Sequence, residues 1–281
     1  MPVDPLTVLL DDAEGAGTLP PDLAALYGGD LRLPAHVVYA NFVSSLDGVV
    51  SLTAPRGAGP TLRGRCDADR FVMGLLRFLA DAILTGAGTL RAEGRHLWTA
   101  GYVDRERADR YRSLGRGEPR LVVVTAGGEL DPAERALQSG ALVLTTDSGA
   151  ASLRGRLPAA CAVRSLGPGP LRAAEIVAAV RAEGHRRVLA EAGPRLVAAL
   201  AAERALDELF LTLSPVLAGR LAGDGRMGLV EGATFLPDDG RWARLRSARA
   251  SGSHLFLRYA LRDPSPHPRQ EAEGGSGGRS G

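Results

Sequence analysis

The chain has 281 residues, of which 45% are hydrophobic and 23% charged, enough apolar material for one large domain or two small ones. A formal net charge of +2 is too small to suggest nucleic-acid binding. The sequence contains no lysine, so all 34 basic residues are arginine. This excludes a Schiff-base lysine, a pyridoxal-phosphate enzyme and a Walker P-loop, and any positive contact to a ligand must come from arginine.

The cysteines and histidines indicate neither disulfides nor a metal site. Cys66 and Cys161 lie far apart in no CxxC pair, which fits a reducing compartment. The five histidines show no metal-binding spacing, so we expect no metal. No apolar run is long enough to span a membrane, and the N-terminus lacks the basic start of a signal peptide. We therefore expect a cytoplasmic protein without membrane partners.

The first part of the chain predicts an N-terminal extension followed by the start of a sheet. Residues 1–34 are polar and rich in glycine and proline, with one short helical pattern at 22–27. Apolar runs predict strands at 37–42 and 49–52, separated by a turn. A glycine- and arginine-rich loop follows at 53–65, and loops of this length in compact domains are usually functional or mobile.

The middle of the chain predicts a helix and then a buried strand. Apolar residues recur at three- and four-residue spacing over 67–79, which is typical of a helix with one buried face. The short apolar run at 82–84 has no helical period and predicts a strand buried on both faces. It breaks into a glycine turn at 85–89. Residues 94–119 are charged and irregular, and predict a surface loop.

Beyond residue 120, short apolar runs alternate with helical patterns. Asp131, Pro132 and Glu134 have the arrangement of a capping box for the next helix. The alternation predicts one α/β domain over 35–262, with a mostly parallel sheet, helices on both faces, and a C-terminal antiparallel hairpin at one edge. Residues 263–281 predict a disordered tail. The expected strands are 121–124, 141–144, 162–163, 187–190, 208–213, 242–250 and 254–261; the expected helices are 132–138, 171–183 and 194–203.

Four strand ends carry turn-forming or polar residues, and ligands of open α/β sheets bind at such carboxyl ends. They are 44–45, 85–89, 125–128 and 191–194. In the turn at 85–89, glycine amides at a helix start could form a phosphate cradle. An ordinary tight turn explains the same residues. Arg91 occupies the third place of the pattern, so this is not a Rossmann fingerprint.

Two acids and several arginines are candidate functional residues, each with a plain alternative. Glu191 follows an apolar strand where a surface charge is unexpected, although it could simply favour the next helix N-terminus. Asp47 precedes glycine in a common turn pair. Four arginines in or just after the 53–65 loop could hold an anionic substrate or form a solvated surface: Arg56, Arg63, Arg65 and Arg70.

At these residues the chain resembles the RibD C-terminal family, the reductase domain of riboflavin biosynthesis, within the dihydrofolate-reductase-like superfamily. Four blocks carry the resemblance in order and spacing, and together they span most of 35–261: 41–48, 76–89, 191–194 with its helix, and 206–219. The resemblance implies a homodimer with a dihydrofolate-reductase-like fold. It also implies NADPH as hydride donor, with a phosphoribosylamino-pyrimidine whose ribose C1 is reduced to give a ribityl chain.

The resemblance also implies roles for individual residues. Glu191 would orient the sugar or assist proton movement, and Asp47 is a second candidate for catalysis. Residues 193–199 would cradle the cofactor pyrophosphate. The full cofactor set is Ser44, Gly86, Gly88, Thr89, Glu93, Thr125, Gly193, Pro194, Arg195 and Leu196. The substrate set is Asn41, Thr61, Arg77, Leu97 and Glu191.

Two departures from the family pattern fall on the substrate side. Asn41 stands where the family has lysine, and Ala100 where it has the arginine for the substrate phosphate. Arg95 or an arginine of the 53–65 loop could replace the latter. The departures keep two alternatives open: the same fold and cofactor with another substrate, such as dihydrofolate, or a non-catalytic NADP-binding protein.

Overall fold

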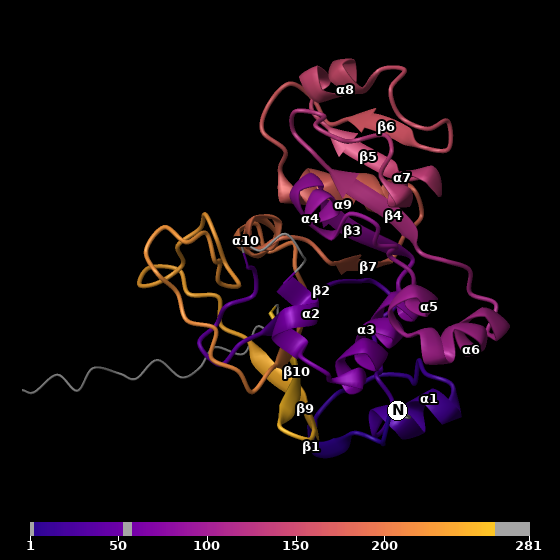
Figure 1. Ribbon diagram of the computed structural model, residues 1–281, viewed down its shortest axis with the longest axis vertical. Coiled ribbons are helices and arrows are strands. Elements are labelled where there is room, and N and C mark those ends of the chain that lie inside the picture. The colour runs from indigo at the N-terminus through magenta and orange to yellow at the C-terminus, as the bar shows by residue number, and fades with distance from the viewer. Residues whose placement is uncertain (1–2, 53–57, 262–281) are drawn as a thin grey trace, which may run out of the picture.

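The computed structural model describes residues 3–52 and 58–261, so the expected tail at 263–281 and part of the 53–65 loop lie outside the described residues. The described strands form one sheet in the order β1-β9-β10-β8-β2-β7-β3-β4-β5-β6 (Figure 1). Their bounds are β1 (Thr7–Asp11), β2 (Val37–Ser44), β3 (Ala82–Gly86), β4 (Arg120–Val124), β5 (Leu142–Thr145), β6 (Ala162–Ser165), β7 (Arg187–Ala190), β8 (Glu208–Leu213), β9 (Arg244–Ser251) and β10 (His254–Ala260).

The sheet is parallel over most of its width, as the sequence predicts. Each neighbouring pair from β8 through β2, β7, β3, β4 and β5 to β6 runs parallel. The hairpin of β9 and β10 pairs antiparallel with β8, and β1 adds to its outer edge. The expected C-terminal hairpin is therefore confirmed, with its turn at 252–253.

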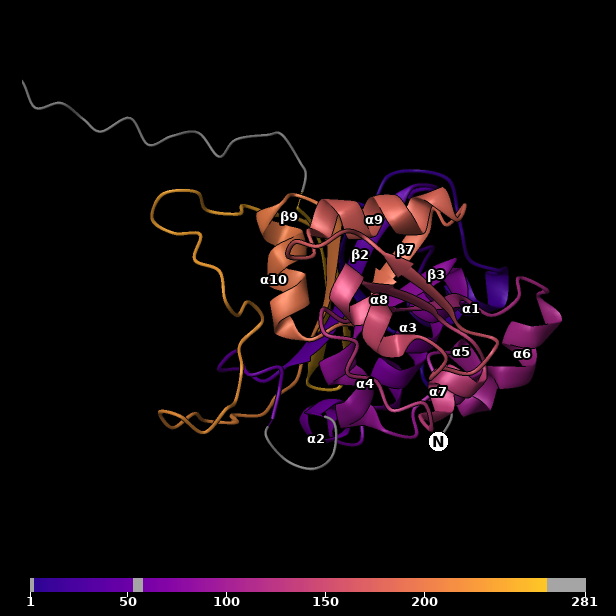
Figure 2. The same ribbon diagram turned by 90° about the horizontal axis from the view of Figure 1, so that it is seen from above.

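Helices cover both faces of the sheet (Figure 2). One core packs α3 residues such as Phe71 and Leu75 against Ile83 of β3, and the other packs Ile176 of α9 against Leu84. No helix of the described residues is both long and apolar enough to cross a bilayer. The helices are α1 (Pro21–Tyr27), α2 (Ala58–Arg63), α3 (Asp67–Leu79), α4 (Ala87–Glu93), α5 (Ala100–Val103), η1 (Arg105–Arg107), α6 (Ala108–Ser113), α7 (Arg135–Gln138), α8 (Asp147–Leu153), α9 (Ala173–Ala182) and α10 (Pro194–Ala202).

The chain changes face once on its way along the sheet. Buried side chains of α3, α4, α7 and α8 belong to one core, and those of α9 and α10 to the other. The strand between α9 and α10 is β7, which inserts between β2 and β3. The connections leaving β3 and β7 therefore depart to opposite faces, which makes a topological switch point between two neighbouring strands.

The N-terminal segment is part of the sheet, which the sequence did not predict. It supplies β1, and its Leu6 and Leu23 join the main core. Arg249 of β9 is 1% exposed, donates to the carbonyl of Tyr27 at 2.8 Å and pairs with Asp11 at 3.0 Å. A buried guanidinium with these partners fixes the segment to the hairpin.

Four expectations about local structure are wrong. The 53–65 segment is not all loop, because α2 covers Ala58–Arg63. Residues 49–52 form no strand, only an isolated bridge between Ser51 and Met227. The 94–119 segment is not an irregular loop, because α5, η1 and α6 lie within it and bury Tyr111 against α3 residue Phe78. The capping box also fails: Asp131 accepts the amide of Ala133 in a turn, and α7 begins only at Arg135.

Candidate active site

The four strand ends singled out by the sequence lie side by side. β2, β7, β3 and β4 are consecutive, parallel neighbours, so their carboxyl ends meet at one edge of the sheet. Glu191 follows β7 and donates its amide to the carbonyl of Leu84 in β3 at 3.0 Å. This edge coincides with the switch point, where diverging connections leave a crevice for ligands.

A buried ion pair occupies this edge. Arg77 of α3 is 2% exposed and Glu191 is 10% exposed. Nε of Arg77 donates to both carboxylate oxygens at 3.0 Å, and its Nη2 donates to Oε2 at 2.5 Å. Such a charge-assisted fork holds the carboxylate in one orientation. The two residues lie 114 positions apart in the chain and meet because α3 packs over the end of β7.

The remaining donors of Arg77 hold the segment before α5. Nη1 donates to the carbonyl oxygens of Leu97 at 3.1 Å and Thr99 at 3.2 Å, and Nη2 also contacts Nε2 of His96 at 2.9 Å. All five N–H groups of the guanidinium are therefore engaged. The structure brings Arg77, Leu97 and Glu191 together, as the family resemblance implies.

His96 belongs to this cluster and was missed from the sequence. A guanidinium can only donate, so Nε2 of His96 accepts and its proton lies on Nδ1, which is 3.8 Å from Oε2 of Glu93. Burial, with the charges of Arg77 and Arg63, lowers the pKa of His96 to about 3. Its ring also packs edge-on against Trp98. The imidazole is thus neutral at physiological pH.

Glu93 lies at the end of α4 on the same side of the site. Burial raises its pKa, opposed by Arg77 and Arg63 and reinforced by Glu191. The side chain therefore stands within electrostatic range of the buried pair. An acid in this environment keeps its proton to higher pH than an exposed one.

Two glycine turns form an open cradle beside the pair. α4 begins after Gly86 and α10 after Gly193, and neither N-terminus has a side-chain cap. A Cβ built on Gly86 or Gly88 meets nothing within 4 Å, and one on Gly193 comes 3.4 Å from Oγ1 of Thr89. The hydroxyl of Thr85, the residue before Gly86, is buried and has no hydrogen-bond partner among the described residues. Open glycine backbone at helix starts fits the pyrophosphate of a dinucleotide.

The other implied ligand residues lie around this edge at different depths. Asn41 follows Ala40, which pairs with Ala190, so it stands level with Glu191 on the neighbouring strand. Ser44 is buried and donates its hydroxyl to the carbonyl of Ser45 at 2.9 Å. The rest differ in exposure: Thr125 and Pro194 are buried, Leu196 is half-buried, and Arg195 and Thr61 are exposed.

Asp47 takes part in a turn rather than in the buried cluster. Its carboxylate accepts the hydroxyl of Ser45 at 2.6 Å and the amides of Ala218 at 3.0 Å and Gly219 at 2.7 Å. These hydrogen bonds, led by that of Ser45, lower its pKa to about 2. This geometry fits the turn-forming alternative, in which Asp47 fastens the turn after β2 to the loop after β8.

Asp69, in the first turn of α3, is a second buried acid that the sequence did not single out. It is 3% exposed, and its Oδ2 has no hydrogen-bond partner among the described residues. Burial raises its pKa, opposed by a hydrogen bond from Thr212 and by the charges of Arg63 and His254. A buried carboxyl oxygen without a partner is rare in folded proteins and marks a candidate ligand contact.

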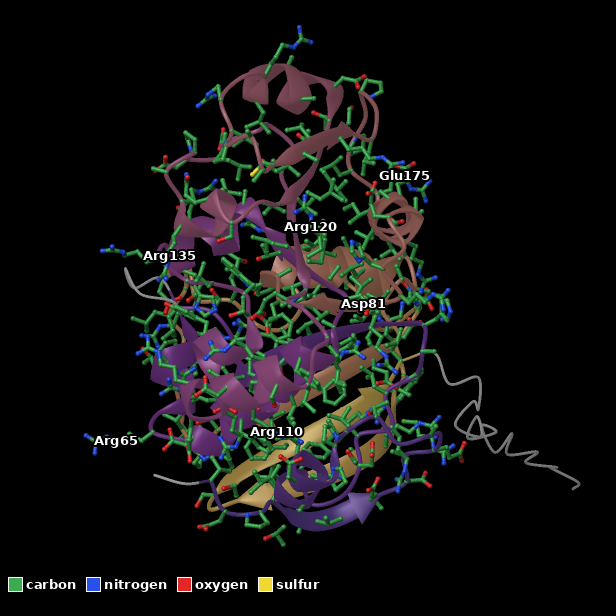
Figure 3. The ribbon with its side chains drawn as sticks, turned by 90° about the vertical axis from the view of Figure 1, so that its right-hand side faces the viewer. Arg65, Asp81, Arg110, Arg120, Arg135 and Glu175 are labelled. Atoms are coloured by element: carbon green, nitrogen blue, oxygen red, sulfur yellow. The ribbon has the colours of Figure 1, made fainter. Side chains whose placement is uncertain are left out.

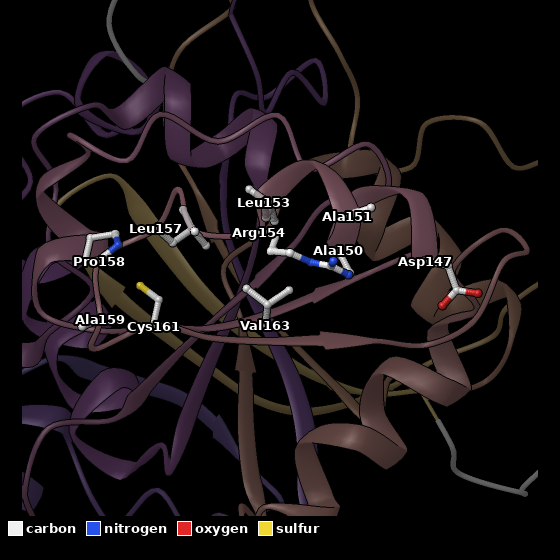
Figure 4. Close-up of a pocket in the computed structure, with 11 residues that line it drawn as sticks. Asp147, Ala150, Ala151, Leu153, Arg154, Leu157, Pro158, Ala159, Cys161 and Val163 are labelled. Carbon is white, nitrogen blue, oxygen red and sulfur yellow. The ribbon is translucent and has the colours of Figure 1, made fainter.

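A separate hollow of about 620 Å³ lies between α8 and β6 (Figure 4). Its lining includes Arg154, Cys161 and Val163. It stands at the outer edge of the sheet, three strands from β3, and contains none of the residues of the switch point. Among the described residues, no three histidine, cysteine or acidic side chains group to hold a metal.

Comparison with known proteins identifies the family. A family model described as the RibD C-terminal domain matches residues 36–252, most of the chain, so the chain belongs to this family. A curated relative from Archaeoglobus fulgidus, 2,5-diamino-6-ribosylamino-4(3H)-pyrimidinone 5′-phosphate reductase, is 26% identical over 202 residues, covering 71% of this chain and 88% of the relative. The family expected from the sequence is confirmed.

Solved structures support the fold. A pyrimidine reductase-like protein from Corynebacterium diphtheriae has a TM-score of 0.63 at 21% identity, covering 86% of this chain and 99% of that one. The riboflavin biosynthesis reductase Rib7 of Saccharomyces cerevisiae has a TM-score of 0.56 at 14% identity, covering 83% and 93%. The expected architecture, a mostly parallel α/β sheet with antiparallel C-terminal strands, is confirmed.

Proposed function

We propose that the protein is an NADPH-dependent reductase of the riboflavin-pathway type, acting on a phosphoribosylamino-pyrimidine. The observation that carries the proposal is the buried Arg77–Glu191 pair beside two open glycine turns at the switch point. Membership of the RibD C-terminal domain family and the reductase activity of the archaeal relative support it. Such a reaction needs a cradle for a dinucleotide and a fixed carboxylate for a sugar, which the two glycine turns and Glu191 would supply.

The cofactor would lie across the ends of β3, β7 and β4. The open backbone at Gly86 and Gly88 and the start of α10 at Gly193 would hold its pyrophosphate, with Thr89 and Thr125 beside it. When bound, NADPH supplies the hydride. This arrangement leaves Glu191 between the cofactor side and the substrate side.

Glu191 would position the sugar. Arg77 fixes its carboxylate, and the remaining lone pairs of that carboxylate can accept hydrogen bonds from ribose hydroxyls. Reduction at C1 would break the bond from C1 to the ring oxygen, and that oxygen would take up a proton. His96 is neutral and holds no acidic imidazolium, whereas burial raises the pKa of Glu93 and suits it better to carry that proton.

The test is NADPH oxidation with defined substrates. We expect consumption with 2,5-diamino-6-ribosylamino-4(3H)-pyrimidinone 5′-phosphate or with its uracil counterpart, 5-amino-6-(5-phosphoribosylamino)uracil. The product should carry two more hydrogens by mass spectrometry. Tight NADPH binding without turnover of either pyrimidine would contradict the proposal and favour a non-catalytic NADP-binding protein.

A second candidate is reduction of a pterin-like ring such as dihydrofolate. The observation that favours it is Asp69, whose unpartnered buried oxygen could accept a ring N–H, together with Asn41 and Ala100 in place of the family's lysine and arginine. Dihydrofolate is therefore assayed in parallel. Consumption with dihydrofolate alone would replace the first candidate by the second.

A further inference from the structure

His96 lies between two acids of the site, although its neutral ring does not itself serve as the acid. Nε2 of the ring is 2.9 Å from Nη2 of Arg77, which also donates to Oε2 of Glu191 at 2.5 Å. On the other side of the ring, Nδ1 is 3.8 Å from Oε2 of Glu93. A continuous path of polar contacts therefore leads from Glu191 through Arg77 and His96 to Glu93.

The backbone places His96 beside Glu93. α4 ends at Glu93, and the amide of His96 donates to the carbonyl of Glu93 at 3.2 Å. Gly94, which follows Glu93, has φ 52°, in the left-handed region that favours glycine, and its amide donates to the carbonyl of Leu90 at 3.0 Å. The turn that ends α4 thus holds the two side chains within reach of each other.

The ring of His96 has little freedom to turn. It packs edge-to-face against Trp98, with ring centroids 5.0 Å apart, and against Tyr102 at 4.7 Å. Trp98 is buried, and the guanidinium carbons of Arg105 and Arg135 both lie 5.9 Å from the ring centroid of Tyr102. Two aromatic contacts therefore fix the plane of the imidazole and the directions in which its nitrogens point.

Arg77 decides which nitrogen of His96 carries the proton. A guanidinium only donates, so Nε2 accepts and the N–H is on Nδ1, the nitrogen nearer to Glu93. Burial and the charges of Arg77 and Arg63 lower the pKa of His96, which keeps the ring neutral. The group next to the Glu93 carboxyl is therefore a neutral N–H donor rather than a second cation.

We propose that His96 is a positioning residue for Glu93: its Nδ1–H holds the Glu93 carboxyl in one orientation and ties both acids of the site to Arg77. The inference rests on the proposed function for the part that Glu93 plays. Glu93 would give its proton to the ring oxygen of the sugar and become a carboxylate, which a hydrogen bond from Nδ1 stabilises. The separation of 3.8 Å is long for a hydrogen bond, and catalytic hydrogen bonds often shorten only when substrate binds.

The first test needs no turnover. The pKa of Glu93 is measured by ¹³C NMR of its carboxyl carbon in the wild type and in His96→Phe, with Glu93→Gln to identify the signal. Phenylalanine keeps an aromatic ring but has no N–H, and the other charged groups that act on Glu93 are unchanged, namely Arg77, Glu191 and Arg63. We expect the pKa of Glu93 to rise by about one pH unit, because the carboxylate loses its donor. An unchanged pKa would overturn the inference.

Kinetics with the phosphorylated pyrimidine test the role. His96→Phe should lower kcat about 10- to 100-fold, because the acid is no longer held in place. His96→Gln can still accept from Arg77 and donate toward Glu93, so it should lose less. In a Glu93→Gln protein, His96→Phe should cost less than about twofold more, because the group that it positions is already gone. His36→Phe removes an exposed histidine at the far end of β2 and should resemble the wild type.

The outcomes separate this inference from the proposed function. Losses that simply multiply in the double variant would overturn the positioning role. A raised pKa of Glu93 in His96→Phe, together with no turnover by the wild type, would support the contact and refute only the proposed reaction. ¹⁵N NMR of the wild-type histidines needs no folded variant: we expect neutral His96 with its proton on Nδ1, and a proton on Nε2 would overturn the inference.

Discussion

A single arginine joins three parts of the site. Arg77 contacts Glu191 after β7, His96 before α5, and the carbonyl oxygens of Leu97 and Thr99. A lysine would offer three donors from one point and could not form this planar fork. The orientation of the Glu191 carboxylate therefore depends on the guanidinium geometry as well as on its charge.

The first prediction concerns Glu191→Gln. The change keeps the size of the side chain and removes its charge, so NADPH affinity should stay within about twofold while turnover falls roughly a hundredfold or more. NADPH titration and steady-state kinetics measure the two effects. The control is Glu175→Gln, an exposed acid on α9 (Figure 3), which should behave as wild type. Unchanged turnover in Glu191→Gln would refute its role.

The second prediction is a pH dependence of stability due to His96. The folded protein keeps this imidazole unprotonated down to a pKa of about 3, whereas the unfolded chain protonates it near 6.5. The unfolded state therefore binds more protons between these values, and the free energy of unfolding falls as pH decreases through that window. From about pH 7.5 to about pH 5 the loss is about 2 kcal/mol.

Chemical denaturation of wild type and His96→Gln at the two pH values isolates this contribution. Glutamine can still accept from Arg77 but does not titrate. Glu93 and Asp69 change the free energy of unfolding in the opposite direction. Burial raises their pKa, so on acidification these groups take up protons at higher pH in the folded protein than in the unfolded chain. Both proteins contain these two acids. We therefore expect the free energy of unfolding of His96→Gln to fall by about 2 kcal/mol less than that of the wild type between the two pH values. Equal losses of unfolding free energy in the two proteins would contradict the low pKa of His96.

Sequence reasoning reached part of the site. Glu191 stood out because a charge directly after a buried strand is unexpected, and Arg77 entered through the family resemblance. His96 and Asp69 gave no signal, because a single histidine and an acid in a first helical turn have ordinary explanations. Their importance comes from burial and from partners that lie far away in the sequence.

At the scale of elements, the two glycine turns leave open space beside the backbone. Their backbone angles do not require glycine. Gly86 has φ −98° and ψ 153°, and Gly193 has φ −64° and ψ 161°, which any residue can adopt. The absence of a side chain there leaves space rather than permitting an unusual turn. This space is what a cofactor needs to approach the backbone.

The third prediction is that Gly86→Val weakens NADPH binding without destabilising the free protein. The new Cβ meets nothing within 4 Å, so the melting temperature should change by no more than a few degrees, whereas NADPH affinity should fall about tenfold or more. Gly169→Val, also open and distant from the site in sequence, is the matched control and should leave affinity unchanged. Equal affinities in the two variants would argue against the cradle.

The segments whose structure was predicted wrongly share a physical cause. β1 contains the apolar residues Val8, Leu9 and Leu10, but all five of its residues are exposed, and it forms because β9 offers an edge for pairing. α5 and α6 lie among charged residues, and few large apolar side chains of this segment are buried, namely Trp98, Val103 and Tyr111. The strand expected at 49–52 has the apolar residues Val49 and Val50 but finds no continuous partner. Whether such a segment becomes a strand or a helix depends on the tertiary contacts that it makes rather than on its own residue pattern.

At the scale of the whole molecule, the fourth prediction is a homodimer. Several of the most exposed large apolar side chains share the segment after β8: Leu217, Leu221, Leu236 and Trp242. Leaving them in water is unfavourable, and a second copy could cover them. Light scattering should give twice the chain mass. Leu221→Arg should weaken the dimer and Val163→Arg, on the opposite sheet edge, should not; a monomeric wild type would contradict the prediction.

The insertion of β7 between β2 and β3 also governs when the site can form. β3 ends at Gly86 and β7 begins at Arg187, so about 100 residues leave the ribosome between the two strands. Until then the facing edges of β2 and β3 have no partner, and non-local pairing of this kind is slow. Until β7 is in place, Arg77 also lacks its ion-pair partner, the carboxylate of Glu191. A nascent or truncated chain therefore has no assembled site, and activity begins only when the last parallel strands close the sheet.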